Sequence, residues 1–278
     1  MKNEKGVTLI ALVMTVILMM ILAGVVVTGI RGGGLFHHAA RAKISTEEAS
    51  KREGIMQSFV LAASMSKTGK VKAEDMQKAL DDTFEKDYAE AIDSSGQLIV
   101  RIDDKFYELD KNGNVGQAIT IEPITGAGDI TRGNTCTGTQ SNPYRIECIE
   151  DLVTFSANVN KGTTYSGKYV ILTKDLDFNS IFSYNDYKAK YEYVEENNSY
   201  EPNENAENTI KELCTTGQGF IPIGKSGKEF SGTFQGDGQK EIKNIFINRE
   251  SAAALFGNSS GKIKNVTLTR RTYCFNNF

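Results

Sequence analysis

The chain has 278 residues, of which 40% are hydrophobic and 24% charged, and its formal net charge is −3. These proportions are typical of a folded globular protein and exclude a chain that is disordered throughout. The slightly acidic balance gives no electrostatic footprint for nucleic acid, so we expect no nucleic-acid partner. Twenty-six glycines with four prolines and no tryptophan are typical of a turn-rich β architecture.

The first predicted element is an uncharged, mostly apolar stretch from Val7 to Ile30. As a helix it is about 36 Å long, enough to cross a bilayer core of about 30 Å. An ordinary secretory signal has its cleavage site after the apolar region. Here the candidate site is Gly6, before that region, so we predict a transmembrane helix over 7–30 that stays on the mature chain. A plain single-pass anchor is the alternative.

Lys5-Gly6, Val7-Thr8-Leu9-Ile10 and the long apolar stretch together resemble the processing segment of type IV pilins and pseudopilins. The resemblance implies a leader over 1–6, cleavage after Gly6 by a prepilin peptidase, and methylation of the new amino terminus at Val7. It also implies other pilin-like subunits as partners. Most members carry Glu where this chain has Ala11, and that carboxylate pairs with a neighbour's terminal amine. Because the pair cannot form without its acid, a minor or tip subunit is favoured over a major one.

Basic residues flank both ends of the apolar stretch, so charge alone does not orient it. The resemblance implies a single-pass membrane protein whose C-terminal bulk lies outside the cell, at the cell surface or in a pilus. The filament would be a type IV pilus-like or a type II secretion-like one.

Residues 31–123 are expected to form a pilin-like helix and a small sheet. Gly32-Gly33-Gly34 lowers helix propensity by about 3 kcal/mol relative to alanines, which predicts a hinge. A helical pattern returns from Leu35 to Met65 and places Ile55, Phe59 and Ala62 on one face.

A second helix is predicted over 72–88, followed by a hairpin of 97–102 with 105–109 and an Asn112-Gly113 turn. Asp110-Lys111-Asn112-Gly113-Asn114 lacks the glycine and glutamate positions of an EF-hand loop, so we interpret it as a turn and not as a calcium site.

Residues 124–141 are rich in Gly, Thr and Ser and are expected to be a linker. Four cysteines occur, and they allow three pairings, among which sequence cannot choose; free thiols are also open. Their spacing matches no common zinc pattern, so we expect no metal site. The four are Cys136, Cys148, Cys214 and Cys274.

The region 142–278 carries a repeat. Ile242-Lys243-Asn244-Ile245 recurs as Ile263-Lys264-Asn265-Val266, 263 − 242 = 21 residues later, and Leu255-Phe256-Gly257 lies between the copies. A period of about 20 residues with short strands and Asn/Gly turns is typical of a solenoid. These motifs resemble the GLUG-type repeat region of bacterial surface proteins, which implies a right-handed parallel β-helix. We interpret 180–212, rich in Asn, Glu, Tyr and Lys, as a surface-loop insertion.

The predicted fold class is therefore α+β, with a long pilin-like transmembrane helix, a small α+β head and parallel β-helix rungs. The function predicted with it is a minor or tip filament subunit that displays an adhesion module, with glycans or proteins of a host or surface as further partners. The alternative is a carbohydrate-binding or carbohydrate-cleaving surface protein whose first helix is only an anchor.

Candidate catalytic groups are few. Asp175 and Asp177, two residues apart, would share a face of one strand, and Asp237 lies near a turn between glycines. Carboxylates are equally common as caps and turn residues, so we expect no enzyme. His37 and His38 are the only histidines and are interpreted as solvated. No cofactor motif is present.

Overall fold

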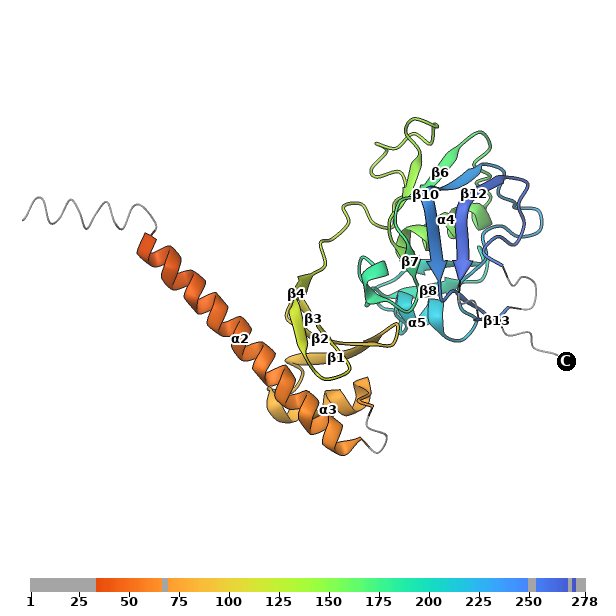
Figure 1. Cartoon of the computed structure of the whole chain (residues 1–278). Helices are drawn as coiled ribbons and strands as arrows, with labels where there is room; N and C mark the ends of the chain where they lie inside the picture. Colours follow the sequence, from red (N-terminus) through yellow and green to blue (C-terminus); the bar gives the residue numbers. More distant parts are fainter. Residues whose placement is uncertain (1–33, 67–69, 250–253, 270–271, 274–278) are drawn as a thin grey trace, which may run out of the picture. The chain divides into compact units, whose positions relative to one another are not determined.

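The computed structural model describes residues 34–66, 70–249, 254–269 and 272–273 (Figure 1). The predicted leader 1–6 and transmembrane helix 7–30 lie outside these residues. The chain divides into two compact units. Unit 1 comprises Met1–Ala89 and Lys111–Val115, and unit 2 comprises Glu90–Asp110 and Gly116–Phe278.

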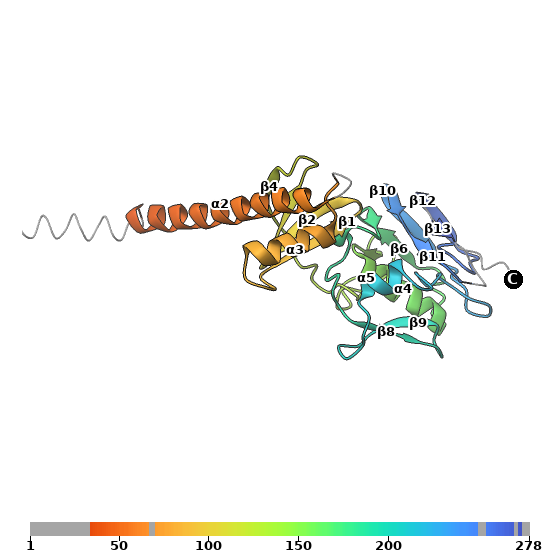
Figure 2. The ribbon, with the colours of Figure 1, turned by 90° about the horizontal axis from the view of Figure 1, so that it is seen from below.

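Two helices that pack side by side form most of unit 1 (Figures 1 and 2): α2, Gly34–Met65, and α3, Ala73–Thr83. The predicted helix over 35–65 is confirmed, and its many Ala, Glu, Lys, Arg and Met residues are strong helix formers. The second helix is shorter than predicted because the backbone at Phe84 is extended, with φ −112° and ψ 170°.

Small residues let the elements of unit 1 approach closely. Gly54 faces the ring of Phe84, which occupies the place that a β-carbon at residue 54 would need. Gly113 has φ +83°, as the predicted Asn-Gly turn requires, and lies against the ring of Phe59. The guanidinium of Arg52 also donates to a backbone carbonyl of the segment that follows this turn.

A four-stranded sheet has the order β1-β2-β3-β4, so consecutive strands are neighbours. Strands β2 and β3 are antiparallel and pair from Leu98 with Leu109 to Ile102 with Lys105, which confirms the predicted hairpin. Ile92, Ile99 and Phe106 form its apolar cluster. The strands are β1 (Ala89–Ser94), β2 (Gln97–Ile102), β3 (Lys105–Leu109) and β4 (Val115–Thr120).

The main sheet of unit 2 is parallel and has the order β12-β10-β6-β5, with β7 also paired to β10. Helix α4, Ile149–Lys161, makes the crossover between β5 and β6, since parallel neighbours need a long connection. The strands are β5 (Tyr144–Ile146), β6 (Tyr169–Leu172), β7 (Leu176–Asp177), β10 (Thr233–Lys243) and β12 (Lys262–Thr269).

Helix α4 lies between the parallel sheet and an antiparallel hairpin, β8 (Tyr191–Val194) with β9 (Ser199–Pro202) (Figure 2). On the sheet side, the ring of Phe155 stacks on Phe234 at 5.7 Å, and on the hairpin side Asn160 donates to the carbonyl of Asn198. The remaining elements are a 3₁₀ turn η1 (Ile181–Ser183), helix α5 (Ile210–Thr215), and a short parallel pair, β11 (Phe246–Ile247) with β13 (Thr272–Tyr273).

The predicted fold class is wrong: the described residues form a mixed α/β structure, with no β-helix solenoid and no long apolar helix. Paired strands of the parallel sheet are joined by a helix in one case and by hairpin β8–β9 with α5 in another, so there are no regular rungs. The repeat is not in register either, because Ile242 pairs with Leu268 whereas Ile263 pairs with Phe234. Asn244 and Asn265 share a φ near +55°, but Asn244 lies in a bend after β10 and Asn265 at an irregularity inside β12. The repeat therefore specifies a similar local backbone and not two stacked rungs.

The segment 180–212, for which the sequence predicts a surface loop, contributes to the core of unit 2. Ile181, Tyr184 and Ile210 are buried in it, and hairpin β8–β9 belongs to it. Its polar composition conceals these apolar positions because they are widely spaced along the segment.

The predicted single-pass membrane localisation is contradicted as well. Within the described ranges, no helix combines the length and the apolar character that a membrane crossing requires. Helix α2 has the length, with 32 residues, but it carries charged residues along its course.

Candidate functional site

Helix α2 presents two different surfaces along its length. Near its C-terminal end, Ile55, Ser58 and Ala62 are fully buried at helical spacing. In contrast, the residues from 43 to 50 are exposed, apart from half-buried Glu48. The helix therefore extends well beyond the part that its own unit covers.

An apolar stripe lies on the exposed side of the same helix. Met56 and Val60, one turn apart, are 46% and 65% exposed, and Ile44 further toward the N-terminus is 57% exposed. Met56 and Val60 line a shallow hollow together with Leu61 and polar neighbours. Exposed aliphatic side chains at helical spacing are typical of a helix that packs against another protein.

The predicted processing and assembly positions, Gly6, Val7 and Ala11, lie outside the described residues. His37 and His38 fall within α2. The structure thus brings none of the sequence-predicted assembly residues together in a described site.

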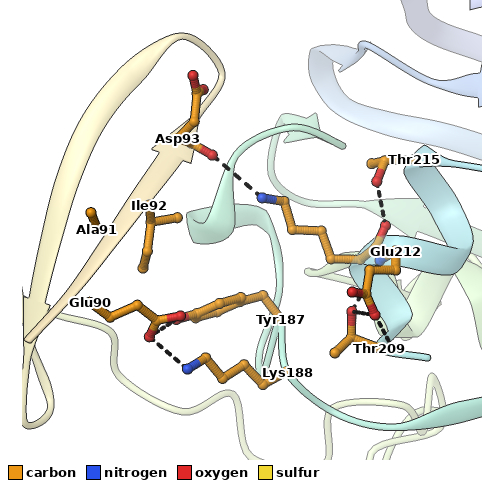
Figure 3. A pocket seen from close by; sticks show the side chains of 10 residues that line it. Glu90, Ala91, Ile92, Asp93, Tyr187, Lys188, Thr209, Glu212 and Thr215 are labelled. Atoms are coloured by element: carbon orange, nitrogen blue, oxygen red, sulfur yellow. Dashed lines mark hydrogen bonds and ion pairs between the residues drawn. The ribbon is translucent and has the colours of Figure 1, made fainter. Parts of the chain in front are cut away.

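Unit 2 contains a separate pocket of about 360 Å³ (Figure 3). Strand β1, the loop after η1 and helix α5 line it, and these come from distant parts of the sequence. The lining residues that carry polar or aromatic groups are Glu90, Asp93, Tyr187, Lys188, Thr209, Lys211, Glu212 and Thr215.

Glu90 is the centre of one side of this pocket. Its Oε2 accepts from Lys188 Nζ at 2.6 Å and from the Tyr187 hydroxyl at 3.3 Å, and Figure 3 shows both side chains directed at it. The guanidinium of Arg101 lies 3.3 Å from the same oxygen. Burial raises the pKa of the Tyr187 hydroxyl, so it stays protonated and remains a donor. The side chains on this side are therefore held in place before any ligand binds.

Helix α5 supplies the other side. Thr209 and Glu212 form a capping box in which Glu212 Oε2 accepts from the backbone N–H and the hydroxyl of Thr209. These bonds lower the pKa of Glu212, so it is ionised at neutral pH. The box fixes both the start of the helix and the position of the Glu212 carboxylate.

Lys211, next to Glu212, is half-buried and weakly bonded. Its Nζ donates to the backbone carbonyl of Asp93 at 3.5 Å, and the described residues give it no salt bridge. Burial lowers the pKa of Lys211, although the carboxylates of Asp93, Glu212 and Glu90 oppose this effect. It therefore lines the pocket as a donor with unused capacity.

The carboxylates considered for catalysis have structural partners. Asp177 accepts from Asn244 at 2.7 Å and from Ser95 at 2.7 Å, and Asp175 accepts from the backbone N–H of Glu241 at 2.9 Å. Asp237 is exposed within β10. The structure does not assemble the three into one pocket, and Asp175 and Asp177 act as structural cross-links.

The cysteines that the structure describes, Cys136, Cys148 and Cys214, are buried free thiols. Burial raises the pKa of Cys148 and Cys214, which makes them poor nucleophiles and poor metal ligands. Within the described part of the chain, no group of three or more metal-binding side chains is found.

Sequence reasoning missed the pocket because its residues lie far apart in the chain and form no motif. One local signal was present: Thr209 followed three residues later by Glu212 has the spacing of a capping box and predicts a helix start. Nothing in the sequence links this helix to Glu90 or Tyr187.

In comparisons with known proteins, no family model, no curated protein and no solved structure matches this chain.

Proposed function

We propose that the chain is a pilin-like subunit, minor or at the tip, of a type IV pilus-like or type II secretion-like filament. Processing by a prepilin peptidase after Gly6 and methylation of Val7 belong to this proposal, as do other pilin-like subunits as partners. The single observation that supports it most is the N-terminal part of helix α2. Its residues 43–50 are exposed, apart from half-buried Glu48, and the rest of unit 1 does not cover them.

The exposed stripe on α2 supports the proposal. Leaving Val60 65% exposed forgoes the favourable burial of an aliphatic side chain, about 1.5–3 kcal/mol for a residue of this kind. A neighbouring subunit's helix laid along Met56 and Val60 would recover part of that free energy. Ala11 in place of the usual Glu supports a minor role.

Processing is the first test. The full chain is produced with and without an active prepilin peptidase, and its start is determined by intact mass and N-terminal sequencing. We expect N-methylated Val7 with the peptidase and Met1 without it. The variant Gly6→Val, which changes the residue before the cut, should keep Met1 in both cases. A wild-type chain that still begins at Met1 beside a peptidase active on a control substrate would refute the proposal.

Assembly is the second test and uses the exposed stripe. Val60→Lys should reduce the amount of the chain recovered in filaments sheared from the producing cells, because it places an ammonium in an apolar helix contact. Val60→Ile is the matched control and should assemble normally. Equal recovery of both variants would show that this face of α2 is not an assembly surface.

A further inference from the structure

We propose that the pocket between β1, the loop after η1 and α5 binds an uncharged, hydroxyl-rich ligand, that is, a short saccharide. This site goes beyond the proposed filament function and does not depend on it. At about 360 Å³, the pocket falls within the range of about 300–1,000 Å³ that is usual for small-ligand sites.

Charge gives an anionic ligand no net attraction. Two carboxylates face the pocket, those of Glu90 and Glu212, against two ammonium groups, Lys188 and Lys211. Lys188 is already paired with Glu90 at 2.6 Å. A phosphate or carboxylate ligand would therefore have only Lys211 to pair with among these lysines, beside the ionised carboxylate of Glu212, which repels it.

A cationic ligand is disfavoured by the existing bonds of the carboxylates. Glu90 already has Lys188 and Arg101 as charge partners, and Asp93 accepts from the backbone N–H of Gly96 at 2.8 Å. The described residues also contain no candidate metal cluster. An uncharged ligand remains as the class that this lining accommodates.

Glu90 and Glu212 each keep one carboxylate oxygen available. The described interactions of both side chains all fall on Oε2. Within the described part of the chain, the second oxygen of each accepts no hydrogen bond. These oxygens suit hydroxyl donors, and their side chains are already fixed by the bonds to the first oxygen.

Lys211 supplies the complementary donor. An ammonium has three N–H groups, and the described residues engage it only through the 3.5 Å contact with the carbonyl of Asp93. A sugar hydroxyl, which both donates and accepts, could bridge Lys211 Nζ and the free oxygen of Glu212.

An apolar wall completes the chemistry. Ile92 of β1 lines the pocket on the same side as the ring of Tyr187, which is half-buried and held by its bond to Glu90 (Figure 3). Carbohydrates present C–H groups as well as hydroxyls, so a lining that mixes aromatic, aliphatic and fixed polar groups matches both.

The test measures binding of neutral sugars to the full chain by ligand-observed NMR and calorimetry. The probes are glucose, galactose, mannose, N-acetylglucosamine and their common disaccharides, with inorganic phosphate and spermidine as charged comparisons. We expect at least one neutral sugar to bind and the charged probes not to compete with it.

Two variants locate the site. Lys211→Met keeps the aliphatic stem and removes the donor, so it should raise the Kd about tenfold. Thr215→Phe places a ring at the α5 wall of the pocket without a change of charge and should abolish binding. Lys262→Met, which changes an exposed lysine in β12, is the matched control and should bind as wild type. Thermal unfolding of each variant shows whether it folds.

Three results would overturn the proposal. The first is that none of the sugars binds. The second is that phosphate or spermidine binds at the pocket in their place. The third is that sugar binding is unchanged in both Lys211→Met and Thr215→Phe. None of these results bears on cleavage after Gly6, so failure here is distinguishable from failure of the filament proposal.

Discussion

Asp151 is fully buried, and its carboxylate accepts four hydrogen bonds. Arg132 donates to both oxygens, at 2.6 and 3.0 Å, and the backbone N–H groups of Gly128 and Glu147 donate at 2.8 and 2.9 Å. The bonds to Asp151 raise the pKa of the Arg132 guanidinium. This one side chain therefore ties the loop before β5 to the first turn of α4.

We expect Asp151→Ala to lower the free energy of unfolding of unit 2 by about 3–5 kcal/mol, because the buried Arg132 would lose both short bonds to Asp151 and keep only the longer 3.7 Å pair with Glu147. Urea unfolding measures the change. Arg145→Ala is the control: its side chain is 51% exposed, and loss of its pair with Glu147 should cost about 0–1 kcal/mol. Equal midpoints for Asp151→Ala and wild type would show that the pair contributes nothing.

At the scale of single elements, local sequence patterns predicted α2 and the hairpin of β2 and β3, because each depends on neighbours within a few residues. They placed the end of α3 too late. Phe84 continues the helical spacing of Met76 and Leu80, yet its backbone is extended and its ring packs against Gly54 of α2. A tertiary contact here overrides periodicity.

That contact makes a prediction about α2. Alanine in place of glycine inside a helix normally stabilises it by up to about 1 kcal/mol. At Gly54 we expect the opposite sign, a loss of about 1–3 kcal/mol, because the new β-carbon would overlap the Phe84 ring. Urea unfolding followed by circular dichroism measures it.

The double variant Gly54→Ala/Phe84→Leu is the control for this prediction, since the smaller side chain leaves room for the methyl group. It should be less destabilised than the sum of the two single variants. A stabilised Gly54→Ala would mean that the ring moves aside at no cost.

At the scale of the whole molecule, one aromatic cluster connects the layers of unit 2. The ring of Phe155 on α4 lies 5.1 Å from Tyr165, 5.4 Å from Phe230 and 5.7 Å from Phe234. These rings come from a helix, two loops and a strand of the parallel sheet. The core of unit 2 thus joins elements that the sequence separates widely.

Phe155→Ala should lower the stability of unit 2 by about 3–5 kcal/mol, since it leaves a cavity within this cluster. The loss is measured as the shift in the urea transition. Phe182→Ala, at a side chain that is 37% exposed, is the control and should cost much less. Comparable losses for the two variants would argue against a core centred on Phe155.

Taken alone, the sequence determined the local structure: the helical stretch of α2, the β2–β3 hairpin, the turn at Gly113 and the positive φ shared by Asn244 and Asn265. These follow from propensity, periodicity and the few residues that tolerate positive φ. Only the tertiary structure decided which strands pair in the parallel sheet, that 180–212 joins the core, and that Glu90, Tyr187 and Lys211 meet in one pocket. Such pairings depend on the packing of segments far apart in the chain, and a repeat of 21 residues specifies a local backbone conformation without choosing the strand that pairs with it.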